Sequence, residues 1–216
     1  MLLNKNKALK LIQKLNNFIK EPKTSLKYRN RFTLLISVVL SAQCTDVNVN
    51  NVTKDVYKKY YRPEHFIKLG EKKIRNLIKR IGLFNNKAKN IHNLSKILVD
   101  KYNGKIPDQF DDLIGLPGVG RKTANVVLNE AFNKPTIAVD THVFRVSNRT
   151  GLSKGNSPAQ VEKQLLNILP DQHLKKAHHL ILLHGRYICK ARKPLCNKCI
   201  INKICLYKHK SWIKKF

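Results

Sequence analysis

Acidic residues are scarce in this sequence. Its 216 residues include 13 Asp and Glu against 43 Lys and Arg, which gives a formal net charge of +30. A surface of that charge attracts polyanions, so the composition excludes an acidic surface and favours a nucleic acid or an anionic membrane as the partner. A compositional bias toward Lys, Ile and Asn is the alternative, since it would raise the charge without forming a binding face.

The sequence also lacks an apolar run long enough to cross a membrane. The longest run, residues 32–42, is interrupted by Thr33, Ser37 and Ser41, whereas a spanning helix needs about 20 predominantly apolar residues. We therefore interpret this run as a buried helix. Residues 1–23 have neither the apolar block nor the small-residue cleavage site of a signal peptide. These absences predict a cytoplasmic protein with no membrane partner.

Cysteine is almost confined to one segment. Four of the five cysteines lie between residues 189 and 205, and the fifth, Cys44, is far upstream. This distribution does not suggest a disulfide framework and favours metal binding in a reducing compartment. Structural zinc is one interpretation, although zinc modules usually show two close pairs of ligands. The candidate ligands have the spacing C-x6-C-x2-C-x5-C and are Cys189, Cys196, Cys199 and Cys205.

Neither strand-like alternation nor an internal repeat is evident. Apolar residues instead recur at helical spacing in nearly every segment, as at Ile91, Leu94 and Leu98. Helix starts are also marked, because Thr45 and Ser157 stand where N-cap residues are expected. We therefore expect an all-α fold of short helices joined by tight turns.

A glycine-rich segment separates two apolar helical patterns. Residues 112–124 have the sequence Asp-Leu-Ile-Gly-Leu-Pro-Gly-Val-Gly-Arg-Lys-Thr-Ala, which predicts a helix, a tight hairpin and a second helix over about residues 108–133. Gly118 and Gly120 allow backbone torsions that other residues avoid, and they leave room for a phosphate to approach the amide N–H groups of the turn. The second helix adds its positive N-terminal end. An ordinary αα-hairpin is the alternative.

This segment, with Val139-Asp140-Thr141-His142 and the cysteine cluster, resembles the endonuclease III family of helix-hairpin-helix DNA glycosylases, essentially from end to end. Further matching stretches are Leu40-Ser41-Ala42-Gln43, Thr45-Asp46, Ile81-Gly82-Leu83, Leu182-Leu183-His184-Gly185-Arg186 and Ala191-Arg192-Lys193-Pro194.

The resemblance implies an all-α, two-domain helix-hairpin-helix DNA glycosylase fold with a C-terminal [4Fe-4S] cluster loop. A six-helix domain over residues 23–134 would contain the hairpin. Residues 1–22 and 135–216 would form a second helical domain, with the cluster loop at 189–205. The cysteine spacing matches the four-iron cluster of this family better than a zinc module, and the four cysteines would be its ligands.

The resemblance also implies a bifunctional enzyme of base excision repair. It would remove oxidised or otherwise damaged pyrimidines from double-stranded DNA and cleave 3′ to the abasic site by β-elimination through a lysine Schiff base. Lys122 would supply the amine, and Asp140 the carboxylate that faces the positive charge developing on the sugar. The alternatives are a solvated lysine at 122 and a simple N-cap at Asp140, a role compatible with catalysis.

A base inside a duplex must be flipped out before excision, and the resemblance assigns the gap-filling side chains to Gln43 and Leu83. Their alternatives are a helix end and a core leucine. We interpret Cys44, where the family usually has alanine, as a small buried thiol. The other expected DNA-contacting residues are Gly118, Val119, Gly120, Arg121, His142, Arg192 and Lys193. His142 has a structural hydrogen-bonding role as its alternative.

Two other functions stay open at the level of sequence. One is a thymine-mismatch glycosylase of similar size. The other is a non-catalytic iron-sulfur protein that binds or senses DNA, which the presence of both Lys122 and Asp140 disfavours. In every case we expect a monomer, nucleoid-associated, with a frayed basic tail over residues 208–216.

Overall fold

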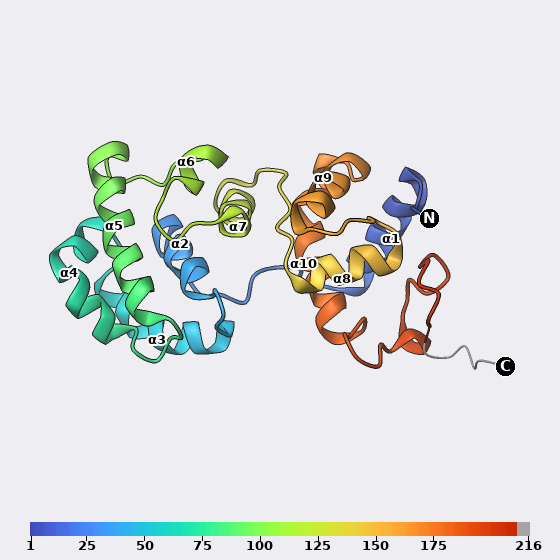
Figure 1. Cartoon of the computed structure of the whole chain (residues 1–216), viewed down its shortest axis with the longest axis horizontal. Coiled ribbons are helices and arrows are strands. Elements are labelled where there is room, and N and C mark those ends of the chain that lie inside the picture. The colour runs from blue at the N-terminus through green and yellow to red at the C-terminus, as the bar shows by residue number, and fades with distance from the viewer. Residues whose placement is uncertain (211–216) are drawn as a thin grey trace. The chain divides into compact units, whose positions relative to one another are not determined.

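The computed structural model describes residues 1–210; residues 211–216 of the basic tail, with Trp212 and Phe216, lie outside the described part. No strand occurs within residues 1–210, so the predicted all-α fold is confirmed. The helices, shown in Figure 1, are α1 (Lys5–Phe18), α2 (Arg31–Leu40), α3 (Asp46–Lys59), α4 (Pro63–Leu77), α5 (Phe84–Tyr102), α6 (Phe110–Ile114), α7 (Arg121–Phe132), α8 (Thr141–Thr150), α9 (Pro158–Ile168), α10 (Asp171–Tyr187) and the 3-10 helix η1 (Cys196–Lys198).

The chain divides into two compact units. One is Ser25–Asn133, which contains α2 to α7. The other combines Met1–Thr24 with the described part of Lys134–Phe216, and it contains α1, α8, α9, α10 and η1. We call them the hairpin unit and the cysteine unit.

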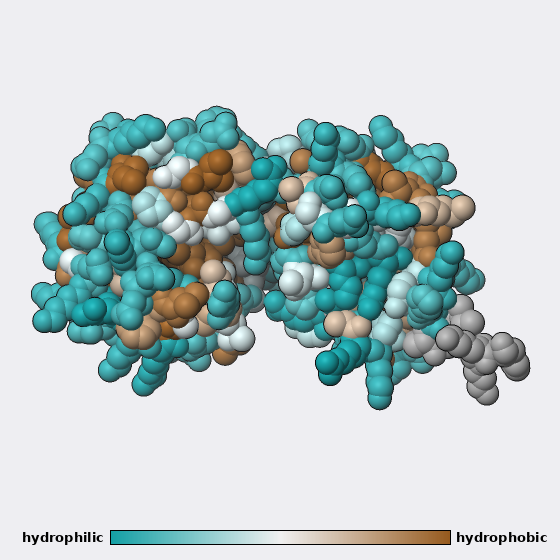
Figure 2. All heavy atoms as spheres, in the orientation of Figure 1, coloured by the Kyte–Doolittle hydropathy of each residue, from teal (hydrophilic) through white to brown (hydrophobic). Residues whose placement is uncertain are grey.

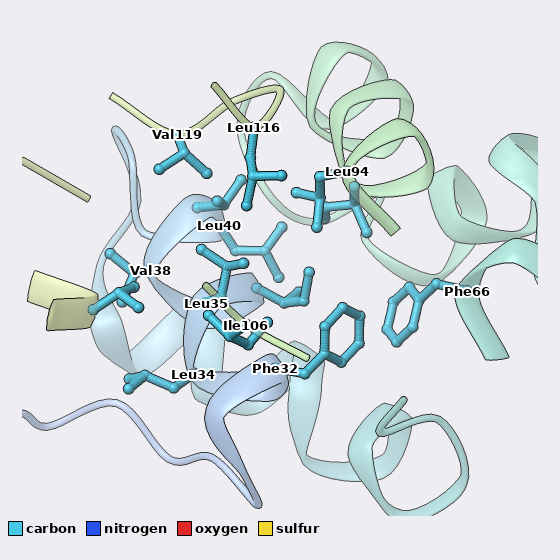
Figure 3. Close-up of a cluster of buried hydrophobic side chains, with 14 of the residues drawn as sticks. Phe32, Leu34, Leu35, Val38, Leu40, Phe66, Leu94, Ile106, Leu116 and Val119 are labelled. Atoms are coloured by element: carbon cyan, nitrogen blue, oxygen red, sulfur yellow. The ribbon is translucent and has the colours of Figure 1, made fainter. Parts of the chain in front are cut away.

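The core of the hairpin unit is built around α2. Every residue of α2 after Arg31 is buried, which confirms that the apolar run is an internal helix. The ring of Phe32 meets that of Phe66 edge to face, with 5.4 Å between the centroids. Leu116 and Val119 belong to the same buried cluster (Figure 3). Since both lie in the turn between α6 and α7, the hairpin is anchored directly to the core.

The core of the cysteine unit joins helices from both ends of the chain. Leu11 and Leu15 of α1 are fully buried, in one cluster with Val143 and Val146 of α8 and Ile181 of α10. This packing fixes α8, whose first turn follows Asp140. The predicted catalytic carboxylate therefore stands at the start of a helix that is packed into the core.

The predicted helix starts at Thr45 and Ser157 are confirmed. Thr45 Oγ1 accepts a hydrogen bond from the backbone N–H of Asn48 at 3.3 Å, and Ser157 Oγ accepts one from Gln160 at 3.3 Å. Pro158 occupies the first turn of α9, where its missing N–H has no cost. Short polar side chains thus start α3 and α9, as their sequence predicts.

Hydrophilic side chains cover most of the face of each unit seen in Figure 2. Among the helices of residues 1–210, none combines the length and the apolar character that crossing a bilayer requires.

Candidate functional site

Tight turns between α6 and α7 form the predicted hairpin. The backbone N–H of Leu116 donates to Leu113 O, and that of Val119 donates to Leu116 O, both at 3.1 Å. Gly118 has φ +79°, and a Cβ there would lie 3.0 Å from Asn90 Cβ and Nδ2. Glycine at 118 is therefore required by both conformation and space.

Gly120 does not need the conformational freedom of glycine, and that part of the prediction is wrong. Its backbone is extended, with φ −92° and ψ 175°, and a Cβ there would meet nothing within 4 Å. Gly120 is the N-cap residue of α7, and no side chain caps this helix. Glycine at 120 therefore leaves open space before a helix N-terminus, a condition for close approach of a phosphate.

Val119 is poorly placed for the predicted DNA contact. Its side chain is 6% exposed and packs in the core, and its N–H is used within the turn. The geometry gives Val119 the role of an anchor for the hairpin.

Arg121 and Lys122 lie exposed in the first turn of α7. The guanidinium carbon of Arg121 stands 4.9 Å from the ring centroid of Phe110, the first residue of α6. This cation–π contact holds Arg121 across the hairpin. The hairpin thus presents two cations at the N-terminal end of α7, with the Lys122 amine open to solvent.

Asp140 is the N-cap of α8, as predicted. Its Oδ1 accepts a hydrogen bond from the backbone N–H of Val143 at 2.7 Å, while Oδ2 has no hydrogen-bond partner within residues 1–210. The three residues before it, Ile137 to Val139, are buried. The carboxylate is therefore positioned by the buried segment before it and by the hydrogen bond to Oδ1. Lys122 belongs to the hairpin unit and Asp140 to the cysteine unit.

His142 lies half-buried in the first turn of α8. Its Nδ1 is 3.1 Å from Arg145 Nη2, and its Cβ would lie 3.0 Å from a Cβ placed on Gly185 of α10. These contacts favour the structural alternative over a DNA contact.

Gln43 and Leu83 share an unusual backbone conformation. Their φ angles are 54° and 60°, in the left-handed region that non-glycine residues rarely adopt. Such residues cost roughly 1–3 kcal/mol each and persist only where the surroundings fix them. Both are exposed, and Leu83 is 56% exposed, so the alternative of a core leucine is wrong. We call residues 41–45 the Gln43 loop and residues 79–83 the Leu83 loop.

Cys44 is half-buried rather than fully buried. Its Sγ lies 3.2 Å from Asn48 Nδ2, and the side chain packs against the core of the hairpin unit. The thiol therefore packs as a small side chain against the core, but it is less buried than we expected.

The four C-terminal cysteines are half-buried. Burial raises the pKa of Cys199 to about 11, and the other three thiols add to the rise because they lie within electrostatic range. Burial also raises the pKa of Cys205. Thiols in such a group become stable thiolates when a cationic centre binds them, which is the chemistry of a metal site. Within residues 1–210, no three His, Cys, Asp or Glu residues are grouped as ligands of a single metal ion.

Two arginines of α8 hold the cysteine segment, and sequence reasoning missed both. Arg145 Nε donates to Cys189 O at 3.1 Å. Arg149 donates to Lys190 O at 2.7 Å and to Ala191 O at 2.9 Å. Their i, i+4 spacing places both on one face of the helix, which is the signal that could have identified them.

Arg192 and Lys193 follow these anchored carbonyls directly and are exposed. Lys193 has φ 50°, so the chain turns sharply at this point. The anchored segment therefore presents two cations to solvent from a fixed backbone.

Comparison with known proteins gives consistent matches. Residues 36–171 match the HhH-GPD family, described as "HhH-GPD superfamily base excision DNA repair protein". Endonuclease III of Rickettsia prowazekii (strain Madrid E) is 55% identical over 202 residues, 94% of each chain. A solved structure of a trapped endonuclease III–DNA covalent intermediate is 45% identical, with a TM-score of 0.89 over 95% of this chain and 97% of that one. A thermostable thymine-DNA glycosylase is 26% identical, with a TM-score of 0.85 over 94% and 96%.

Proposed function

This chain belongs to the endonuclease III family of the HhH-GPD superfamily of base excision DNA repair proteins. From this membership we propose the roles of its site residues, the class of lesion that it removes and its cofactor. It is a DNA glycosylase with AP lyase activity, and its partner is DNA. We infer that its substrates are oxidised and other damaged pyrimidines in duplex DNA. This activity on DNA is consistent with a location in the cytoplasm at the nucleoid.

The chemical proposal rests on the exposed Lys122 of the hairpin. It also rests on the similarity of this chain to an endonuclease III whose covalent intermediate with DNA has been trapped. A relative 45% identical to this chain forms a covalent intermediate with DNA, and such an intermediate needs a nucleophile. Lys122 offers its amine from the first turn of α7. Attack at the anomeric carbon C1′ forms the C–N bond and breaks the bond to the base, which leaves with a proton. The C1′–O4′ bond then opens, O4′ takes up a proton, and the nitrogen and C1′ form a Schiff base. Loss of a C2′ proton from the Schiff base drives β-elimination, which breaks the C3′–O bond to the 3′ phosphate.

Asp140 acts on the same sugar through charge. As positive charge develops at the anomeric carbon, a fixed carboxylate stabilises it without having to reorganise. The hydrogen bond from Val143 N–H to Oδ1 supplies that rigidity. Asp140 also receives the proton that the attacking amine must lose.

Phosphate binding and gap filling complete the proposal. The open N-terminus of α7 beside Gly118 and Gly120, with Arg121, would hold backbone phosphates, and Arg192 and Lys193 would add contacts. Gln43 and Leu83 would fill the space of the flipped nucleotide, and their exposure and fixed backbone support this role. Their substitution by Ala should weaken excision from duplexes more than reaction with an abasic site in single-stranded DNA.

We propose that Cys189, Cys196, Cys199 and Cys205 hold a [4Fe-4S] cluster. The residues fit this group, since the four thiols lie in mutual electrostatic range. When bound, the cluster supplies a scaffold for the basic segment that follows Cys189. Purified protein should contain about four irons per chain and absorb visible light. Stoichiometric zinc without colour would contradict the assignment.

Single-turnover excision on a panel of duplexes tests the function. The panel contains an oxidised pyrimidine, a G·T mismatch and a preformed abasic site, with borohydride trapping in parallel. We expect excision and trapping with the oxidised pyrimidine. Preference for the mismatch would instead favour the second candidate, a thymine-mismatch glycosylase, suggested by the structural neighbour of that kind. Tight binding without any excision or trapping would indicate a non-catalytic DNA-binding protein.

A further inference from the structure

Lys87 is a buried lysine that contacts both loops proposed to enter DNA. It lies near the start of α5 and is 5% exposed. Its Nζ donates to Leu40 O at 2.9 Å and to Ala42 O at 2.6 Å. Its backbone N–H donates to Leu83 O at 3.1 Å, which is the first i→i−4 bond of α5 and does not depend on the side chain at 87. One residue is therefore bonded through its side chain to the neighbour of Gln43 and through its main chain to Leu83.

The bonds from Nζ have a clear physical reason. α2 ends at Leu40, and the last carbonyls of a helix lack partners within it. A cation is favoured at this negative end of the helix. Burying an ammonium group is nevertheless unfavourable, and burial lowers the pKa of Lys87. The site therefore keeps a costly charge at the point where the Gln43 loop leaves α2.

A second side chain joins the same two loops. Asn48 Nδ2 donates to Arg80 O at 3.0 Å and lies 3.2 Å from Cys44 Sγ. A Cβ on Gly82 would lie 3.7 Å from Gln43 O, so the two loops are in close proximity. Lys87 and Asn48 thus connect the Gln43 loop and the Leu83 loop by independent bonds.

We propose that Lys87 is a positioning residue for gap filling, which locks the Gln43 loop and the Leu83 loop together so that both side chains enter DNA as one rigid element. This inference rests on the gap-filling roles proposed above for Gln43 and Leu83. Each of these residues is held in a left-handed conformation that it would leave if its surroundings relaxed. Without the Nζ bonds the Gln43 loop relaxes. The free energy needed to order it must then come from binding to DNA.

Lys87→Met tests the proposal, because methionine fills much of the same buried space and removes the donors. We expect single-turnover excision from a duplex to fall about tenfold, while reaction with an abasic site in single-stranded DNA stays within about twofold of wild type. Lys96→Met is the matched control, since Lys96 is an exposed lysine on the same helix. It removes the same charge and should change neither rate. Equal losses by Lys87→Met on both substrates would overturn the positioning role.

A double-mutant cycle with Gln43→Ala tests whether Lys87 acts through its loop. If it does, the double variant should be little slower on duplex DNA than Gln43→Ala alone, because the two changes remove one function. Fully multiplicative losses would contradict the proposal. The fluorescence of 2-aminopurine opposite an abasic site gives a second readout, since insertion changes base stacking. Lys87→Met should lose the fluorescence change that wild type produces on binding, and retention of the full change would overturn the inference.

The outcomes separate this inference from the function on which it rests. If Gln43→Ala and Leu83→Ala slow duplex and single-stranded reactions equally, the gap-filling role itself is wrong. If both show duplex-selective losses but Lys87→Met does not, only the positioning role is wrong. Should Lys87→Met fail to fold, Asn48→Ala removes the second link from a half-buried position and carries the same prediction.

Discussion

At the scale of single residues, Lys122 and Asp140 occupy contrasting environments that suit different tasks. The lysine amine is exposed, whereas the carboxylate is half-buried and fixed by a backbone N–H. An attacking amine must move to its target, whereas a group that stabilises charge works best when it is already in place. Substitutions at the two positions should therefore affect different steps.

Lys122→Ala should abolish both borohydride trapping and strand cleavage, because no other amine is expected to reach the anomeric carbon in the required geometry. Binding to a lesion-bearing duplex should persist, since the phosphate contacts remain. Denaturing gels measure the trapped and cleaved products, and anisotropy measures binding. Efficient trapping by the variant would show that the nucleophile has been assigned to the wrong residue.

Asp140→Asn should slow base excision about 10²-fold, because it removes the negative charge that stabilises the sugar cation. Asparagine is also a good N-cap, so the free energy of unfolding should change by less than about 0.5 kcal/mol. A preformed abasic site has already lost its base, and there the variant should keep a larger fraction of its activity. Single-turnover rates on the two substrates measure this difference, and equal defects would contradict the division of labour.

At the scale of elements, the sequence predicts helix starts well and loop geometry poorly. Thr45 and Asp140 can be recognised as caps because their hydrogen bonds are local. The conformation of Gly120, the exposure of Leu83 and the buried contacts of Lys87 depend on segments distant in the chain. One signal for a buried Lys87 was present in the sequence, because Lys87 stands four residues before Ile91 and therefore on the same apolar face of α5. Helical periodicity could not show which backbone carbonyls would accept hydrogen bonds from the Lys87 ammonium group.

The two glycines of the hairpin should respond differently to substitution. Gly118→Ala should lower the free energy of unfolding by about 1–2 kcal/mol, because φ is +79° and the added Cβ would contact Asn90. Gly120→Ser should leave stability unchanged or slightly raised, since serine is a good N-cap and the space is open. Its hydroxyl would occupy the N–H groups proposed to hold phosphate, so DNA affinity should fall. Chemical denaturation and anisotropy measure both effects, and unchanged affinity would argue against phosphate binding there.

At the scale of the whole molecule, the residues with proposed roles are distributed over both compact units. The hairpin unit supplies Lys122 and the gap-filling loops, and the cysteine unit supplies Asp140 and the basic segment. The sequence indicated the proposed site residues of both units, because these residues lie in continuous motifs such as residues 112–124 and 139–142. The arginines that hold the cysteine segment were not predicted, since their spacing marks a shared helix face but does not show that their partners are backbone carbonyls about 40 residues away.

The formal charge of +30 raises the question of how much of it contacts DNA, and salt dependence answers that question. Each phosphate neutralised releases about 0.9 counterions, so the slope of log affinity against log salt counts contacts and ignores charges that merely cover the surface. If about six phosphates are neutralised, affinity should fall about 10³-fold between about 50 and 200 mM salt. Arg192→Gln with Lys193→Gln should reduce the slope by about 2, whereas Lys96→Gln should leave it unchanged. An affinity insensitive to salt would mean that the lysine-rich composition forms no binding face. An equal change of slope in both variants would mean that attraction is spread over the whole surface and is not focused by the anchored segment.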